Sequence, residues 1–278
     1  MMSALSQRLA ARLAAADCVL VSVDASQGSV PREAGAWMAV FGQDVLGTVG
    51  GGQLELQAIE EARRRLAGAA GEAVLRYPLG PGLGQCCGGV MQLRFEPVNA
   101  ADALSVAARL APQRIPVALF GGGHVGSALV AALGPLPFAV RWIDSRDEIF
   151  PAIRPDNVEC EHSDPVQAAV ADLVAGTHVM IMSFSHAEDL DVVAACLARQ
   201  RQHGDLPFIG LIGSKTKWAS FRQRLEQRGC SRQELAQVTC PIGLAGIKGK
   251  QPEVIAVSVA AQLLQLRSWE TQPQPPKK

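Results

Sequence analysis

The sequence predicts an α/β protein in which a doubly wound parallel sheet follows a smaller α/β domain with a mixed sheet. From residue 116 onward, predicted strands and helices alternate with short connections, the pattern of a parallel sheet covered on both faces. A glycine-rich turn, GGGHVG at 121–126, separates the first strand of this half from its helix. The chain has 278 residues, which is enough for about two domains of ordinary size.

The first half is predicted to form the smaller domain. Leu5, Leu9 and Leu13 share one face of a helix over 3–16. Apolar segments bounded by Gly, Pro and polar residues predict the strands. The remaining predicted elements are strands at 18–23, 36–41, 45–49, 73–79 and 90–98 and helices at 53–66 and 100–110.

The second half is predicted to form the parallel sheet. Its strands lie at 116–120, 138–143, 177–183 and 207–212, and its helices at 124–133, 165–174, 187–201, 215–228 and 253–266. The Pro-containing segment 111–116 marks the boundary. The predicted domains are therefore 1–110 and 111–270, and the polar, Pro-rich tail at 271–278 is expected to be disordered.

Composition and charge exclude several classes of function. The 26 basic residues balance the 26 acidic ones, which argues against a nucleic-acid partner. The uncharged segment 115–140 is long enough to span a bilayer, but its glycines and prolines would break a spanning helix, so no membrane association is expected. The N-terminus has no apolar signal segment, and seven scattered cysteines do not suggest a disulfide framework. A reduced, cytoplasmic protein is therefore expected.

The turn at 121–126 has the spacing Gly-x-Gly-x-x-Gly between a strand and a helix. Gly121, Gly123 and Gly126 permit a tight turn, and a phosphate can then approach the helix N-terminus beside His124. The next strand ends in Asp144, 18 residues beyond Gly126, where an acid often accepts hydrogen bonds from ribose hydroxyls. These features predict a Rossmann-type domain. The turn either binds a nucleotide or serves only to pack the helix on the strand.

Two further glycine-rich segments lie in the first half. Gly50, Gly51 and Gly52 precede a helix, whose free amides either hold an anionic group or have no ligand. Adjacent cysteines, Cys86 and Cys87, are a poor zinc pair. Thiols in a glycine-rich loop suit a reactive or soft-metal-binding role, which is favoured for Cys87, whereas Cys86 equally suits a buried small side chain.

Polar residues also follow two later strands of the predicted sheet, where open α/β sheets bind ligands. His186 and Asp189 are candidate site residues, or they cap the next helix. Ser214 and Lys215 open a basic helix, with Ser214 as a plausible N-cap and the lysine on a solvated face as the alternative.

Taken together, the motifs resemble the xanthine dehydrogenase accessory protein family of the XdhC/CoxI type. The N-terminal motifs are GSVPREAGAWM at 28–38, GTVGGGQLE at 47–55 and CCGG at 86–89. The C-terminal motifs are FGGGHVG at 120–126, WIDSRDEIFP at 142–151, GLIGSKTKWASFRQRL at 210–225 and CPIGLAGIKGKQPEVIAVSVAAQLL at 240–264. The chain departs from the family pattern at Phe184, where the family often has His.

The resemblance implies a protein that matures the molybdenum cofactor. Such a protein binds the cofactor in its molybdopterin form, keeps it available for exchange of an oxo ligand for sulfur, and delivers it to apo-xanthine dehydrogenase. The implied partners are the molybdenum subunit of that enzyme and a cysteine desulfurase. The family's Cys-Gly-Gly aligns with Cys87, Gly88 and Gly89, so Cys87 is the expected molybdenum contact. The apolar C-terminal helix suggests a homodimer.

Two enzymatic alternatives stay open beside an accessory protein without turnover of its own. One is an NAD(P)-dependent oxidoreductase with the dinucleotide at 121–126 and Asp144, and with His186 or Lys215 as proton donor. The other is an enzyme of the sulfuration step with a persulfide on Cys87. The residues predicted to bind the molybdenum cofactor, NAD(P) or another nucleotide are Gly50, Gly51, Gly52, Cys87, Gly121, Gly123, His124, Gly126, Asp144, His186, Ser214 and Lys215.

Overall fold

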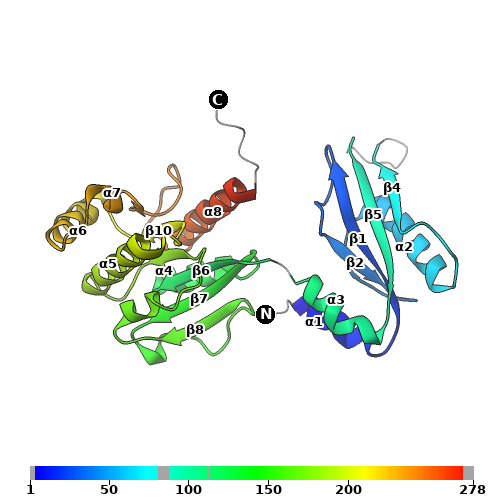
Figure 1. Cartoon of the computed structure of the whole chain (residues 1–278), viewed down its shortest axis with the longest axis horizontal. Coiled ribbons are helices and arrows are strands. Elements are labelled where there is room, and N and C mark those ends of the chain that lie inside the picture. Colours follow the sequence, from blue (N-terminus) through cyan, green and yellow to red (C-terminus); the bar gives the residue numbers. More distant parts are fainter. Residues whose placement is uncertain (1–3, 81–87, 112, 272–278) are drawn as a thin grey trace. The chain divides into compact units, whose positions relative to one another are not determined.

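Two separate sheets organise the chain, one in each half (Figure 1). The computed structural model describes residues 4–80, 88–111 and 113–271. The chain divides into two units, Met1–Pro112 and Gln113–Lys278. Two predictions fall outside the described residues: the roles of Cys86 and Cys87, and disorder of nearly all of the C-terminal tail.

The N-terminal unit contains a five-stranded sheet in the order β3-β2-β1-β5-β4. Its strands are β1 (Cys18–Gln27), β2 (Trp37–Val40), β3 (Val45–Gly47), β4 (Val74–Pro78) and β5 (Val90–Val98). All neighbouring pairs are antiparallel, so the mixed sheet expected from the sequence is corrected to an antiparallel one. The helix α2 (Gly52–Leu66) connects two strands that run in the same direction, β3 and β4, but these lie at opposite edges of the sheet.

Helices cover the two faces of this sheet unequally. The helix α2 covers one face, where Leu54 and Ala58 belong to the same buried cluster as Val21 and Leu93. On the other face, α1 (Ala4–Leu13) and α3 (Ala103–Arg109), the latter preceded by a 3₁₀ turn at Ala100–Asp102, contribute to a second cluster. That cluster ends partway along β1 and β5, and the rest of this face carries both polar and apolar side chains, among them Gln92, Arg76 and Val90.

The C-terminal unit contains a six-stranded parallel sheet in the order β11-β10-β9-β6-β7-β8. Its strands are β6 (Ile115–Phe120), β7 (Phe138–Asp144), β8 (Val158–His162), β9 (His178–Ile181), β10 (Phe208–Leu211) and β11 (Val238–Thr239). The chain begins at β6 in the middle, builds outward to one edge, then returns to build the other half. This confirms the predicted α/β fold with a Rossmann-type sheet. Sheets of this kind bind ligands where the strand order reverses, here between β6 and β9.

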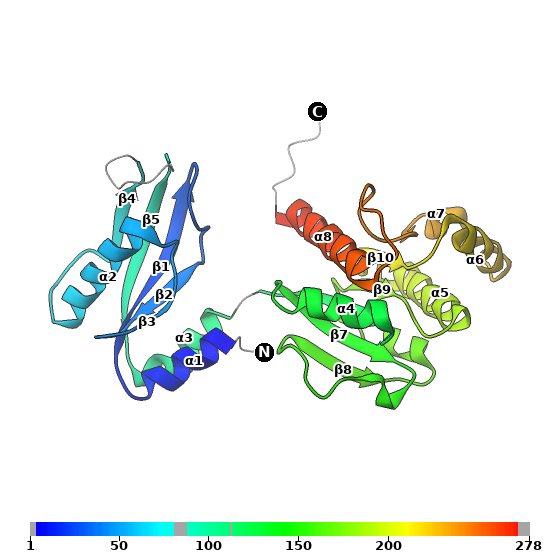
Figure 2. The same cartoon turned by 180° about the vertical axis from the view of Figure 1, so that it is seen from behind.

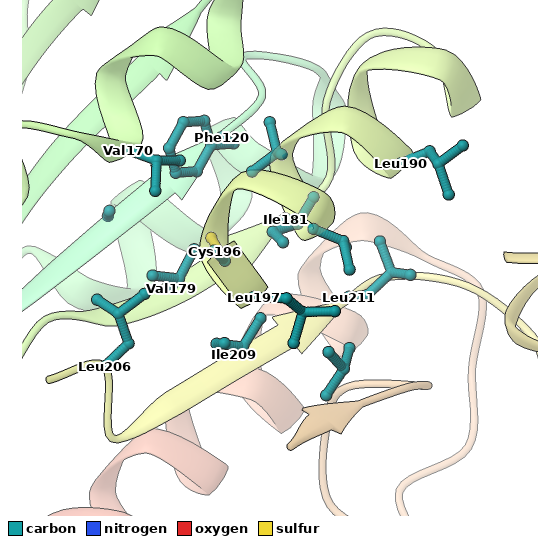
Figure 3. Packing of buried hydrophobic residues seen from close by; sticks show 14 of the residues in the cluster. Phe120, Val170, Val179, Ile181, Leu190, Cys196, Leu197, Leu206, Ile209 and Leu211 are labelled. Carbon is teal, nitrogen blue, oxygen red and sulfur yellow. The ribbon is translucent and has the colours of Figure 1, made fainter. Parts of the chain in front are cut away.

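Helices cover both faces of the parallel sheet. They are α4 (His124–Leu133), α5 (His186–His203), α6 (Lys215–Gln227), α7 (Arg232–Leu235) and α8 (Pro252–Thr271). On one face α4 and α8 lie side by side (Figure 2), and their apolar residues cluster with Leu119 and Trp142. On the other face α5 packs Cys196 and Leu197 toward Val179, Ile181 and Ile209 (Figure 3). Successive residues of a strand thus point to opposite faces, and both faces are buried.

The structure differs from the predicted elements in the second half at several places. The helix expected at 165–174 is only a 3₁₀ turn at Val166–Val170, although three of its residues are buried as a helix would require. The strand β8 was not predicted because it is short and mostly polar, and β11 because it has two residues. A 3₁₀ turn at Asp147–Ile149 follows β7. None of the helices in the described ranges combines the length and the apolar character needed to span a membrane.

Candidate functional site

The carboxyl edge of the parallel sheet brings together the residues predicted in the second half. The glycine turn at 121–126 follows β6, Asp144 ends β7, and His186 begins the helix after β9. Ser214 and Lys215 lie at the start of the helix after β10. The turn and the segment after β9 lie on the two sides of the point where the strand order reverses.

Two glycines of the turn are required for packing. A Cβ atom on Gly121 would lie 2.0 Å from the carbonyl oxygen of Met182, and the φ of Gly121 is +122°. A Cβ atom on Gly126 would lie 2.0 Å from the carbonyl oxygen of Gly121. The same oxygen accepts a hydrogen bond of 3.0 Å from Nε1 of the buried Trp142. These two glycines therefore hold the turn against its own sheet and helix.

Gly123 differs from them, because its surroundings are open. An added Cβ atom would meet no described atom within 4 Å, and its φ of −68° suits any residue. Gly123 is the N-cap of α4 and supplies no side-chain cap, whereas Ser185 and Ser214 cap α5 and α6. His124 begins the first turn of α4. The backbone amides of this turn can therefore donate hydrogen bonds to an anion.

Asp144 is paired within the chain. Its carboxylate belongs to a residue only 1% exposed and accepts hydrogen bonds from the amide of Gly122 at 2.6 Å and from the backbone and guanidinium of Arg146 at 2.8–2.9 Å. Burial disfavours the charged carboxylate, but these hydrogen bonds outweigh it and hold the pKa of Asp144 below its ordinary value. Asp144 is therefore not the free acceptor that the sequence led us to expect. A ribose would have to displace Arg146.

Two contacts connect the loops on either side of the glycine turn. The guanidinium of Arg146, after β7, lies 4.4 Å from the ring centroid of Phe184, after β9. Ser145 Oγ donates a hydrogen bond of 2.7 Å to Glu188 Oε1 in the first turn of α5. The loops after β7 and β9 are thus tied together, although the strands themselves are separated by β6.

A buried ion pair anchors the loops after β9 and β10. Lys217 Nζ lies 2.5 Å from Asp189 Oδ2 and donates a second hydrogen bond to the carbonyl oxygen of Ile212. Asp189 Oδ1 accepts from the amide of Ser183 at 2.7 Å. Asp189 is 2% exposed, so its carboxylate fixes the loop rather than facing solvent.

Of the residues predicted here after β9 and β10, His186, Ser214 and Lys215 are exposed and Asp189 is buried. His186 is the first residue of α5, and its ring lies edge-on to Phe221 with the ring centroids 6.3 Å apart. Lys215 is the first residue of α6 and forms no ion pair with any described residue. Ser214 Oγ accepts a hydrogen bond from the amide of Lys217, which confirms its expected role as an N-cap.

The glycine turn of the N-terminal unit already holds an anion, the carboxylate of Glu55. Glu55 Oε2 accepts hydrogen bonds from Thr48 Oγ1 at 2.5 Å, from the amide of Val49 at 3.0 Å and from the amide of Gly51 at 3.1 Å. The amide of Gly50 donates to Thr48 Oγ1. The amides of residues 49–51 are thus used within the chain, which corrects the expectation of free amides at Gly50 and Gly51. For Gly52, the first residue of α2, binding stays a prediction.

Three N-terminal motifs meet at one end of the five-stranded sheet. A Cβ atom on Gly89 would lie 2.5 Å from the carbonyl oxygens of Gln27 and Ser29. A Cβ atom on Gly50 would lie 2.6 Å from Cγ of Pro31. The loop at 28–35 therefore contacts both the glycine turn and Gly89, two residues after Cys87.

The described cysteines are poor candidates for a reactive thiolate. Burial raises the pKa of each, to about 12 for Cys18 and Cys196. The other three with a raised pKa are Cys160, Cys230 and Cys240. All five are free thiols. In the parts of the chain that the structure describes, no group of three His, Cys, Asp or Glu side chains is arranged to hold a metal ion.

Comparison with known families decides the identity. Residues 117–263, more than half of the chain, match the XdhC Rossmann domain, and residues 11–78 match the XdhC and CoxI family. The chain belongs to the XdhC and CoxI family. The Rossmann match begins within β6 and ends within α8, so it includes the whole carboxyl edge described above.

Two relatives of this XdhC-family chain are informative about length and fold. It is 24% identical over 274 residues to the uncharacterized protein YqeB of Escherichia coli K12, an alignment that covers 93% of this chain and 46% of YqeB. The chain thus spans about half the length of that curated relative. A crystal structure named as a xanthine dehydrogenase from Bacillus halodurans has a TM-score of 0.75 at 20% identity and covers 98% of both chains. This likeness shows that the two share a fold.

The family motifs contain three residues whose pairing within the chain the sequence did not predict. Arg146 lies in the motif at 142–151, Lys217 in the motif at 210–225, and Glu55 ends the motif at 47–55. Motif membership was thus a usable signal for them. Spacing alone did not show that Arg146 pairs with Asp144 or that Glu55 fills the glycine turn, because both depend on side-chain conformation.

Proposed function

We propose that this XdhC-family chain is an accessory protein of xanthine dehydrogenase that binds the molybdenum cofactor in its molybdopterin form. In this role it supports sulfuration of the cofactor and delivers it to the apo-enzyme. Family membership carries the proposal, because both halves of the chain match in order. The partners are the molybdenum subunit of the enzyme and a cysteine desulfurase, and the working form is a homodimer. The protein binds and transfers without turnover.

The N-terminal unit supports this proposal by its geometry. The loop at 28–35 contacts both the turn at 50–52 and Gly89, so segments far apart in sequence meet at one end of the sheet. A soft thiolate near this end suits a molybdenum–dithiolene centre. Burial raises the pKa of every described cysteine. The family's Cys-Gly-Gly aligns with Cys87, Gly88 and Gly89, so we assign the thiol contact to Cys87.

Analysis of the purified protein tests the proposal. The full chain is purified without oxygen from a host that makes the cofactor, its molybdenum content is measured, and the released pterin is identified by mass spectrometry. We expect molybdenum and pterin in equal amounts. A chain that carries neither, under conditions in which a known molybdenum enzyme from the same cells is loaded, would contradict the proposal.

An NAD(P)-dependent oxidoreductase is the second candidate, favoured by the open space at Gly123 and the uncapped start of α4. Because Arg146 occupies the Asp144 carboxylate, we expect dinucleotide binding to be weak and to discriminate poorly between NAD and NADP. Titration of the protein with NADH and NADPH, followed by nicotinamide fluorescence, measures this. Tight, strongly NADP-selective binding would show that our assignment of Asp144 is wrong.

A further inference from the structure

One half of a sheet face in the N-terminal unit is bare, in the sense that no described helix of this unit covers it. Residues of β1, β5 and β4 form rows across the sheet, and Ala25, Gln92 and Arg76 occupy one such row in register. Gln27 and Val90 belong to the next row on the same face. Leu20 and Val98, further along the same face, are buried in the cluster that α1 and α3 contribute to. The bare rows lie beyond it.

This bare half contains a hollow of about 320 Å³. The residues that line it are Ala25, Ser26, Gln27, Arg76, Val90 and Gln92. A register shift in β1 between Val23 and Ala25 lies beside the hollow. Such bulges are frequent next to binding sites because they redirect side chains.

The polar groups of the hollow are suited to an anionic heterocycle. Arg76 is exposed and, within the described ranges, pairs with no carboxylate, whereas Arg94 on the same face pairs with Asp24 at 2.8 Å. A free guanidinium binds phosphate with two parallel hydrogen bonds. The carboxamides of Gln27 and Gln92 each offer a donor and an acceptor, which match the amide-like edge of a pterin ring.

The hollow also lies at the end of the sheet where the N-terminal motifs meet. Gln27, which lines it, is the residue whose carbonyl oxygen a Cβ atom on Gly89 would approach to 2.5 Å. Gly28 also lies close to this point, because a Cβ atom there would be 3.1 Å from Cα of Gly89. The amides of residues 49–51 do not offer an alternative phosphate site, because those of Val49 and Gly51 donate to Glu55 and that of Gly50 donates to Thr48 Oγ1.

We propose that this hollow binds the phosphate-bearing pterin part of molybdopterin, with Arg76 on the phosphate and Gln27 and Gln92 on the ring. The inference rests on the proposed function and assigns a place to its ligand. It predicts that removal of the Arg76 charge weakens binding only when the pterin carries its phosphate.

The experiment uses the fluorescent pterin phosphate that is obtained when molybdopterin is oxidised with iodine, together with its dephosphorylated form. Fluorescence polarisation measures the affinity of the full chain for both probes. The variants are Arg76→Gln and Gln92→Glu, with Arg8→Gln as a matched control on an exposed position of α1. Circular dichroism confirms that each variant is folded.

We expect Arg76→Gln to weaken binding of the phosphorylated probe at least tenfold and binding of the dephosphorylated probe less than twofold. Gln92→Glu should weaken both probes, because the carboxylate cannot donate to the ring as the carboxamide does, and Arg8→Gln should change neither. Unchanged binding in Arg76→Gln, or an equal loss in Arg8→Gln, would overturn the assignment. If the parent binds no probe yet carries molybdenum and pterin when purified, the assignment of the hollow as the pterin site is wrong and the proposed function stands. If it carries neither, both fail.

Discussion

Asp144 has the position in the sequence of a ribose-binding acid, but in the structure its carboxylate is already paired. Its position at the end of β7 was predicted correctly from the strand pattern, and it lies where ribose-binding acids lie. What the spacing could not show is that the guanidinium of Arg146 folds back onto it. Arg146 also contacts Phe184, a residue from a different loop. Contacts of this kind depend on the packing of the whole edge.

The pairing of Asp144 predicts a dependence of stability on pH. Because its pKa is lowered in the folded state, the unfolded chain binds the proton more tightly, so the stabilisation is present above the ordinary value of 3.8 and is lost as the pH falls below it. We expect Asp144→Asn to cost roughly 2 kcal/mol at pH 7. The difference from the parent should shrink as the pH falls below about 4.

Urea denaturation between pH 3 and pH 7 measures this, with Asp156→Asn as a control at an exposed position of the same unit. The control should stay within about 0.5 kcal/mol of the parent. A cost of Asp144→Asn that is the same at every pH would contradict the assigned ion pair.

Glu55 is the corresponding case in the N-terminal unit, where a side chain occupies the anion position at the start of α2. Its removal leaves two amides and a hydroxyl without their acceptor, so Glu55→Ala should lower the free energy of unfolding by about 2 kcal/mol. The vacated turn should then accept an external anion.

Thermal unfolding with and without sulfate checks this second residue-scale prediction. Sulfate should raise the melting temperature of Glu55→Ala more than that of the parent or of Glu60→Ala, a control at an exposed position of the same helix. Equal responses of all three proteins would mean that the turn does not bind anions.

At the scale of elements, the sequence predicted what depends on local periodicity. The strand–turn–helix unit from β6 to α4 was predicted within a residue at each end, because an uncharged strand, a glycine turn and an apolar helix follow one another directly. The antiparallel order of the first sheet was not predicted. The helix α2 suggested a parallel crossover, but β3 and β4 pair with other strands.

We predict opposite effects of substitution at two glycines of this turn, Gly121 and Gly123. Gly121→Ala places a Cβ atom 2.0 Å from the backbone of Met182 at a φ of +122°, so it should destabilise the protein by roughly 3 kcal/mol or more. Gly123→Val should fold like the parent, because the space around it is open, but it should lose any nucleotide that binds at α4.

Melting temperatures and a titration with NADH separate the two effects. If Gly123→Val binds as the parent does, the turn serves packing alone. If Gly121→Ala is as stable as the parent, then Gly121 does not lie as close to the backbone of Met182 as described.

At the scale of the whole molecule, function depends on what the topology brings together. The strand order of the parallel sheet places the glycine turn, Asp144 and the start of α5 at one edge, which the alternation of elements already implied. The meeting of the loop at 28–35 with Gly50 and Gly89 in the N-terminal unit did not follow from any spacing, because the segments come from three separate connections. The placement of the candidate residues was therefore predicted better in the second unit than in the first.

Transfer of the cofactor tests the central claim most directly. The full chain is loaded with molybdenum cofactor without oxygen and mixed with apo-xanthine dehydrogenase, and the activity that appears is compared for the parent, Cys87→Ser and Cys86→Ser. We predict that the parent activates the enzyme. The variant Cys87→Ser should fold but activate it at least tenfold less, because a hydroxyl is a poor ligand for a soft metal. The variant Cys86→Ser should lose less activation than Cys87→Ser. A parent protein that retains no cofactor and activates no apo-enzyme would contradict the account.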